Sequence, residues 1–273
     1  MGAGALLTFA ATSSANAALF ALTSFGNELV TVDPTTGQAT EIRSLGENVA
    51  GFDLATYNGR LYTFSDSTNS IREINPYTAQ LVSSIDIGAG DQVGEGALAI
   101  SGTGMGFFSS ANDSSFSTGG MNRLYSFNLV TMTSALVTQT EFVIDALAFS
   151  SGGTTLYAIG QAEGRLFTID QLTGAVTVVG ELGLTPAQQN PFAGLAFGDD
   201  GTLYGALDDR LYTIDTTTGA ATAVNPGLPD FGIGVASVSG LVFAVPEPSS
   251  VGLGVMGTAM LLIRRKRRAS DKI

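Results

Sequence analysis

A short pattern recurs five times along the chain and constrains the fold more than any other feature. In each copy apolar and polar residues alternate, as a half-buried β-strand requires, and the copy ends in Asp or Asn. Thr follows three residues after the Asx in every copy, and Gly follows that Thr in three. An Asx side chain caps tight turns and Gly supplies a positive φ, so the pattern predicts β-hairpins. The copies are Glu28–Asp33, Ser70–Asn75, Arg123–Asn128, Arg165–Asp170 and Arg210–Asp215.

Two further strand types precede these hairpins and complete a four-stranded unit. One contains a Leu-Tyr pair, as in Gly59–Phe64, and before it lies a shorter, more apolar strand such as Ala146–Phe149. Successive Asx positions are 42, 53, 42 and 45 residues apart, which is typical of propeller blades and too long for a β-helix rung. The sequence therefore predicts an all-β fold, a β-propeller with four strands in each blade.

The two ends of the repeated region do not match, and together they account for one blade. The first unit, from Ala18, lacks an inner strand, whereas residues 235–238 and 241–245 supply strands without a hairpin. A ring in which the last strand joins the first blade explains both fragments and removes exposed sheet edges. We expect one five-bladed propeller over residues 18–245, which resembles secreted bacterial propellers with Leu-Tyr and Asp-x-x-Thr-Gly repeats. Six blades would need an extra blade within residues 97–140, where we expect Ser109–Gly120, rich in Ser and Gly, to be an insertion loop.

The residue types that the chain lacks exclude several kinds of active site. The sequence has no His, no Cys and no Trp. It therefore cannot form a Ser-His-Asp triad, a cysteine nucleophile, a thiolate or imidazole zinc site, or a disulfide framework. Residues 18–245 hold 22 acidic and 6 basic residues, a net charge of −16, which argues against binding nucleic acid through its phosphates.

Acidic residues outside the repeat suggest a cation site, whereas those inside it suggest turns. A ligand site would normally use one or two blades, so we interpret the repeated Asp and Thr as turn structure, and Asp199-Asp200-Gly201 and Asp208-Asp209 as hairpin tips. Loops that precede the inner strands surround the tunnel, where converging carboxylates would repel one another unless a cation such as Ca²⁺ bound them. Glu95 and Asp145 are the candidate calcium ligands; the alternative is solvated acidic loops. The loop candidates are Glu47, Asn48, Asp91, Glu95, Glu141, Asp145, Asn190 and Asp230.

Residues 1–17 have the pattern of a secretory signal peptide. An apolar stretch is followed by small residues, and Ala15-Asn16-Ala17 fits the A-x-A preference of signal peptidase. We expect cleavage after Ala17. No Lys or Arg precedes Arg43, so the basic start of a signal peptide is missing and the true start codon is expected upstream.

The C-terminal end carries three parts in a defined order. Residues 246–250 begin with Pro246, Glu247 and Pro248, and the prolines favour an extended linker. Residues 251–263 form an apolar run, about 20 Å long as a helix, which can insert into a bilayer if flanking residues are drawn in and the arginines snorkel. The tail 264–273 is predicted to stay cytoplasmic by the positive-inside rule. Its basic stop is Arg264, Arg265, Lys266, Arg267 and Arg268.

This order of parts, over about residues 245–268, resembles the PEP-CTERM sorting domain that exosortases recognise in Gram-negative bacteria. The resemblance implies export across the inner membrane, transient anchoring there, and processing near the motif by an exosortase, a transpeptidase-like membrane enzyme. It often accompanies exopolysaccharide production. Pro246, Glu247 and Pro248 would then be a recognition tag, with the mature protein at the outer surface, in the periplasm or in the extracellular matrix. A plain C-terminal membrane anchor is the alternative.

Two functions of different classes are compatible with these observations. In the first, the protein is a non-enzymatic propeller that binds exopolysaccharide or a surface protein through one face of the ring. In the second, it is a carboxylate- or metal-dependent hydrolase of glycosidase or lactonase type, with Glu95 and Asp145 as the first pair to test. The chain lacks Trp, a common stacking platform for sugars, and His, the usual proton shuttle, so binding is favoured. We expect no catalytic residues and no cofactor other than Ca²⁺.

Overall fold

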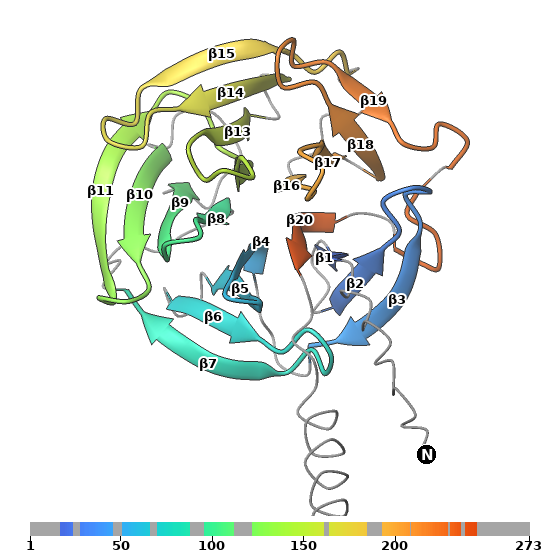
Figure 1. The fold of residues 1–273 in the computed structure, drawn as a ribbon, viewed down its shortest axis with the longest axis horizontal. Helices are drawn as coiled ribbons and strands as arrows, with labels where there is room; N and C mark the ends of the chain where they lie inside the picture. Colours follow the sequence, from blue (N-terminus) through green and yellow to red (C-terminus); the bar gives the residue numbers. More distant parts are fainter. Residues whose placement is uncertain are drawn as a thin grey trace, which may run out of the picture.

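The strands of the protein form five four-stranded antiparallel blades around a central axis (Figure 1). The structure is a computed structural model and describes residues 17–23, 28–45, 51–65, 70–87, 96–111, 122–160, 164–184, 193–207, 209–228, 230–235 and 238–244. The predicted five-bladed propeller is confirmed, and the six-bladed alternative is wrong because the described residues within 97–140 form a single blade.

Blades 2 to 5 each use four consecutive strands, the first at the axis and the fourth at the rim. Blade 2 contains β4 (Gly51–Tyr57), β5 (Arg60–Ser65), β6 (Ser70–Ile74) and β7 (Leu81–Asp86). Blade 3 contains β8 (Leu98–Ile100), β9 (Met105–Ala111), β10 (Asn122–Asn128) and β11 (Thr133–Thr140). Blade 4 contains β12 (Ala146–Phe149), β13 (Leu156–Gly160), β14 (Arg165–Ile169) and β15 (Val176–Glu181). Blade 5 contains β16 (Ala193–Phe197), β17 (Leu203–Leu207), β18 (Arg210–Ile214) and β19 (Ala221–Ala223).

Blade 1 closes the ring by combining the two ends of the body. Its order is β20 (Val238–Ala244), β1 (Ala18–Thr23), β2 (Glu28–Val32) and β3 (Ala39–Ser44), so the last strand lies innermost and pairs with the first. Ala18 stands opposite Ala244, and Leu22 opposite Gly240. The predicted closure is therefore confirmed, with one correction. The sequence indicates two separate closing strands, at 235–238 and 241–245. The structure instead has one strand that begins at Val238, because Gly240 and Leu241 both pair with β1.

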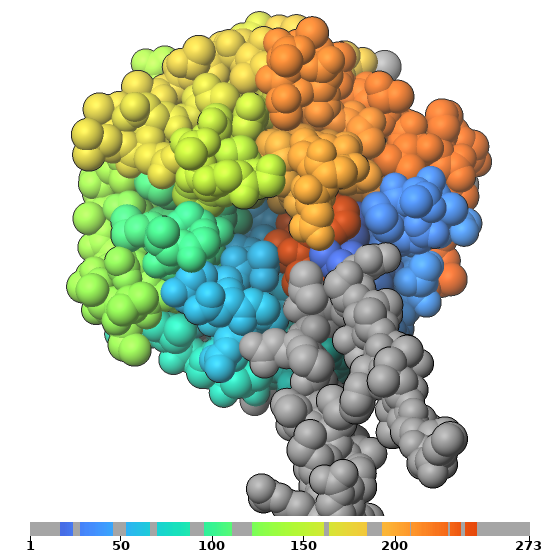
Figure 2. Space-filling view, viewed as in Figure 1, coloured from blue at the N-terminus to red at the C-terminus, as the bar shows by residue number. Residues whose placement is uncertain are grey.

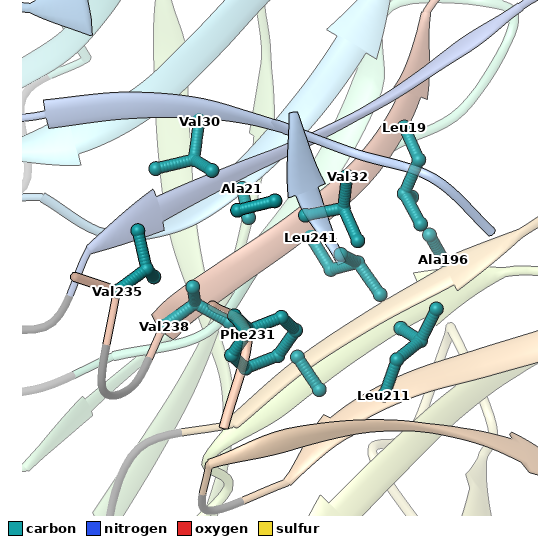
Figure 3. Packing of buried hydrophobic residues seen from close by; sticks show 12 residues of the cluster. Leu19, Ala21, Val30, Val32, Ala196, Leu211, Phe231, Val235, Val238 and Leu241 are labelled. Carbon is teal, nitrogen blue, oxygen red and sulfur yellow. The ribbon is translucent and has the colours of Figure 1, made fainter. Parts of the chain in front are cut away.

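The apolar core is divided into five clusters, one between each pair of neighbouring blades, and the blades pack closely side by side (Figure 2). Leu of each Leu-Tyr or Leu-Phe pair is almost fully buried, as at Leu61, Leu166 and Leu211, which confirms that these pairs are packing residues. At the closure, Phe231 from the segment after β19 lies among residues of blades 1 and 5, including Val238 and Leu211 (Figure 3). The blade that contains the closing strand is thus packed against blade 5 by its own buried apolar cluster.

The five Asx turns have one common geometry. In every turn the carbonyl oxygen of the Asx accepts a 2.8 Å hydrogen bond from the amide four residues later, and the Asx side-chain oxygen accepts at least one further amide. That fourth residue has a positive φ whether it is Gly, as at Gly219, or not, as at Ala79 and Met132. Because all five copies use the Asx in this local way, the structural interpretation of the repeat is confirmed.

One predicted loop is partly a strand. The segment Ser109–Gly120 was expected to be an insertion loop, but Ser109, Ser110 and Ala111 belong to β9. Ser109 can be buried there because its hydroxyl donates to the carbonyl of Ile144 and accepts the amide of Ala97, both at 2.8 Å. Residues 112–120 lie outside the described part of the chain.

The two faces of the ring carry different connections between strands. In each blade the connections between strands one and two and between strands three and four lie at the same end of the sheet, which we call the hairpin face. The opposite, crossover face carries the connections from blade to blade. Ala18 and Ala244 both lie at the hairpin end of blade 1, beside Val32. Among the described residues no helix is long and apolar enough to span a membrane.

Candidate functional site

The innermost strands share a three-residue pattern at the level where they approach the axis. Four of them have a small residue followed by Leu and then Ala or Val; they begin at Ala97, Ala146, Gly194 and Gly240. In blade 2 the same position is held by Asp53, in Asp53-Leu54-Ala55, and the pairing of Leu54 with Thr63 matches that of Leu147 with Ala158. A single carboxyl group therefore replaces a small side chain at the centre of the ring.

The carboxyl group of Asp53 accepts backbone amides from several blades. Its Oδ1 accepts the amide of Leu54 at 2.8 Å, and its Oδ2 accepts those of Leu98 at 3.0 Å and Leu147 at 3.5 Å. The amide of Leu241, on the closing strand β20, also contributes a hydrogen bond. These strands are far apart in the sequence, and this one side chain joins backbone amides of blades 1, 2, 3 and 4.

The environment of Asp53 determines its protonation. The side chain is fully buried, and desolvation raises the pKa of its carboxyl group well above the usual 3.8, against the smaller opposing effect of the amide hydrogen bonds. Its backbone carbonyl is also occupied, because the hydroxyl of Thr63 donates to it at 2.8 Å. With its oxygens engaged by backbone amides and closed off from solvent, Asp53 is suited to holding strands together and not to proton exchange with a substrate.

Two glycines let the innermost strands approach closely beside Asp53. A Cβ at Gly240 would lie 2.7 Å from the Cα of Asp53 and from the amide nitrogen of Leu54. A Cβ at Gly194 would lie 2.6 Å from the backbone of Gly240 and Leu241. These approaches bring β16, β20 and β4 into backbone contact, so the space around the ring axis is narrow at the level of Asp53.

Above Asp53, on the hairpin side, the axis opens into a cavity of about 240 Å³. Its walls are the ends of the innermost strands, with Phe149, Phe197 and Phe243 among them, and Thr56 and Asp199 add polar groups. Asp199 is the one carboxylate among the described lining residues. Chemistry that needs a pair of carboxylates is therefore not provided by this lining.

The structure describes only some of the acidic and amide candidates in the loops before the inner strands. Glu141, Asp145 and Asp230 are described, whereas Glu47, Asn48, Asp91, Glu95 and Asn190 lie outside the described residues. Asp145 is half-buried directly before β12, and its amide donates to the carbonyl of Ile159 at 2.9 Å. Asp230 accepts the amide of Gly232 at 2.8 Å. The calcium hypothesis for Glu95 and Asp145 stays a prediction. Within the described ranges no three acidic side chains gather closely enough to hold a metal ion.

The acidic turn residues are occupied locally. Hydrogen bonds from Thr35, Thr173 and Thr217 lower the pKa of Asp33, Asp170 and Asp215 respectively. The predicted hairpin tip at 199–201 is confirmed: Gly201 has φ +83°, and Asp200 accepts the amide of Thr202. In the second tip, Asp209 forms an ion pair with Arg210 at 3.0 Å, and Asp208 lies outside the described residues.

Sequence reasoning missed Asp53, although the sequence contains a signal for it. Once the five innermost strands are aligned on their shared Leu, Asp53 is the one acidic residue in a column of Ala and Gly. When one repeat carries a charged residue where the other repeats have small residues, that residue has a role that only its own repeat performs.

The known proteins similar to this one share its fold at low sequence identity. No protein-family model and no curated protein matches the sequence. A chain from a crystal structure of a nidogen/laminin complex superposes with a TM-score of 0.51 and 11% identity, covering 85% of this chain and 100% of that chain. A luciferin-regenerating enzyme superposes with a TM-score of 0.50 and 13% identity, covering 79% of this chain and 78% of that one. At such identities these likenesses show the fold alone.

Proposed function

We propose that the protein is an exported, surface- or matrix-associated propeller that binds an extracellular partner and is not an enzyme. In this proposal a signal peptidase removes residues 1–17, and residues 251–263 hold the protein transiently in the inner membrane. An exosortase-type enzyme then processes it near Pro246, Glu247 and Pro248, with the basic stop 264–268 on the cytoplasmic side. The support for sorting is the order of these parts in the sequence.

The observation that carries the proposal is the position of the chain ends on the ring. Ala18 and Ala244 stand opposite each other at the hairpin face, and β20 runs toward that face. A membrane segment that follows Ala244 therefore attaches the ring by its hairpin face. The crossover face, where the described candidates Glu141, Asp145 and Asp230 lie, is then turned away from the membrane and is available to a partner.

Binding is favoured over hydrolysis by the state of the described carboxylates. The most deeply buried one, Asp53, is held by backbone amides, and the axial cavity is lined by Asp199 alone among described acidic residues. Glycosidases need two accessible carboxyl groups on either side of the scissile bond. The body charge of −16 further favours neutral glycans or a protein surface over polyanions as partners.

The test combines processing and binding. Mass spectrometry of the protein exported by an exosortase-containing host should find a mature form that begins after Ala17 and lacks the basic tail. An intact tail on the mature protein would refute exosortase processing. The same preparation should bind a component of a glycan array or a surface-protein library, without turning over glycoside or lactone substrates. Turnover that Glu95→Gln abolishes would instead establish the hydrolase.

A further inference from the structure

One position of the Asx turn divides the blades into two groups. Two residues after the Asx, blades 1 and 5 carry Thr35 and Thr217, whose hydroxyls donate to the turn aspartate at 2.7 and 2.6 Å. Blades 2, 3 and 4 carry Tyr77, Val130 and Leu172 at this position, with 46%, 69% and 88% of their surfaces exposed. The polar tips are satisfied within their own turn, whereas three neighbouring blades present large apolar side chains to solvent.

Further apolar groups extend this arrangement on blade 3. Met132, in the same turn as Val130, is 60% exposed, and Met105 is 39% exposed. Met105 and Leu172 also border a hollow of about 470 Å³ between blades 3 and 4, and none of its described lining residues is charged. We call Tyr77, Val130, Met132 and Leu172 the apolar arc. Several large apolar side chains exposed on one face of an acidic protein indicate an interaction surface.

The apolar arc lies on the face from which the chain ends emerge. Its residues belong to turns between third and fourth strands, which are at the hairpin end of each blade, as are Ala18 and Ala244. Only residues 245–250 separate Ala244 from the apolar run 251–263. A fully extended chain of this length reaches about 25 Å at most, so a bilayer that holds the run lies within that distance of the hairpin face.

We propose that the apolar arc inserts into the surface of the bilayer that residues 251–263 enter, so that blades 2 to 4 rest on the membrane. This inference rests on the membrane anchoring in the proposed function. The arc side chains protrude from turn tips, as interfacial insertion requires, and Tyr is suited to the headgroup level. The body has no Lys and a net charge of −16, and Asp170 lies in the same turn as Leu172, so the attraction is hydrophobic and anionic lipid opposes it.

The chain has no Trp, so a single introduced Trp reports on one site. The full chain would be reconstituted in phosphatidylcholine vesicles as the Leu172→Trp variant, with Thr217→Trp as the matched turn position and Glu141→Trp on the crossover face. We expect blue-shifted emission and several-fold stronger quenching by brominated lipid for Leu172→Trp than for either control. The quenching should fall when phosphatidylglycerol is added and when Val130→Ser and Met132→Ser are combined with the probe.

The outcomes separate this inference from the anchoring itself. If the protein binds vesicles but the Leu172→Trp probe is no more quenched than the Glu141→Trp probe, the inserted arc is wrong and the anchor stands. Equal quenching of the Leu172→Trp and Thr217→Trp probes would also overturn the assignment to blades 2 to 4. A blue shift that depends on protein concentration and not on lipid would identify a second copy as the occupant. Failure of the full chain to bind vesicles would reject the anchor and the arc together.

Discussion

The turns of this propeller are stabilised by residues that recur in every blade, whereas the axis is stabilised by one residue that does not recur. At the turns, five copies of one motif make nearly the same hydrogen bonds, all within a few residues. At the axis, one residue departs from the repeat, and Asp53 accepts amides from strands of four blades. The comparison indicates that repeated residues stabilise each hairpin independently, whereas a non-repeated residue joins the blades to one another.

Replacement of Asp53 should have the largest effect on stability. The Asp53→Ala change leaves the buried amides of Leu98, Leu147 and Leu241 without an acceptor, and we expect a loss on the order of 3–5 kcal/mol in the free energy of unfolding. Urea unfolding measures this, and Asp53→Asn, which keeps one carbonyl oxygen, should cost less. A loss of about 0.5 kcal/mol, as for an ordinary surface change, would show that the axis does not depend on this residue.

Adding a side chain at the close approach beside Asp53 should cause the next largest loss of stability. In Gly240→Ala the new Cβ meets the backbone of Asp53 and Leu54, which cannot move aside as a flexible side chain could, so we expect a loss of about 1–3 kcal/mol. Gly102→Ala is the matched control, because a Cβ there meets nothing within 4 Å. Equal melting temperatures for the two variants would mean that the innermost strands can separate without cost.

The dependence of stability on pH should differ between axis and turns. Burial raises the pKa of Asp53, so its contribution is complete below the ordinary value of 3.8 and is lost as pH rises through the folded-state value. The pKa values of Asp33, Asp170 and Asp215 are lowered, so their contributions are present above 3.8 and are lost as pH falls through the lowered values. Melting temperature should therefore be highest between the lowered pKa values of the turn aspartates and the raised pKa of Asp53. The decline above the raised pKa should flatten in Asp53→Asn; an unchanged decline would assign it to other groups.

Loss of the hydrogen bonds of one Asx turn should have the smallest effect on stability. Asp215→Ala removes the acceptor for the amides of Thr217 and Thr218 and for one hydroxyl, in an exposed turn of one blade. We expect a small fall in melting temperature and faster amide hydrogen exchange confined to the β18–β19 hairpin. Faster exchange at Leu98 or Leu147 in this variant would contradict the independence of turns and axis.

The sequence predicts the blades well because turn chemistry is local. Asx and Thr, with Gly after the Thr in three copies, indicate each hairpin from neighbouring residues alone. The mismatched ends, from Ala18 and at residues 235–245, predict the closure. Ser109 was misplaced because Ser-rich composition suggests a loop, whereas its hydroxyl is satisfied by Ala97 and Ile144 from other strands. Such long-range partners cannot be read from neighbouring residues.

The site was harder to predict because its geometry depends on the whole ring. The sequence places Asp145 before an inner strand, but it gives no distance to the acidic residues of the next blade. Asp53 was overlooked since it alternates with apolar neighbours like any exposed residue of a half-buried strand. Only the ring brings it within reach of Leu98 and Leu147, 45 and 94 residues away in sequence.

The placement of β20 also decides how the ring bears a mechanical load. If a bound partner pulls on the crossover face while residues after Ala244 are held, the force enters the protein along β20. This strand pairs with β1 from Ala18 to Thr23, and its hydrogen bonds run across the direction of pull. All of them are then loaded together in shear and do not open one at a time. Under the proposed function, the noncovalent seam of the ring is thus oriented to resist tension between the membrane segment and a bound partner.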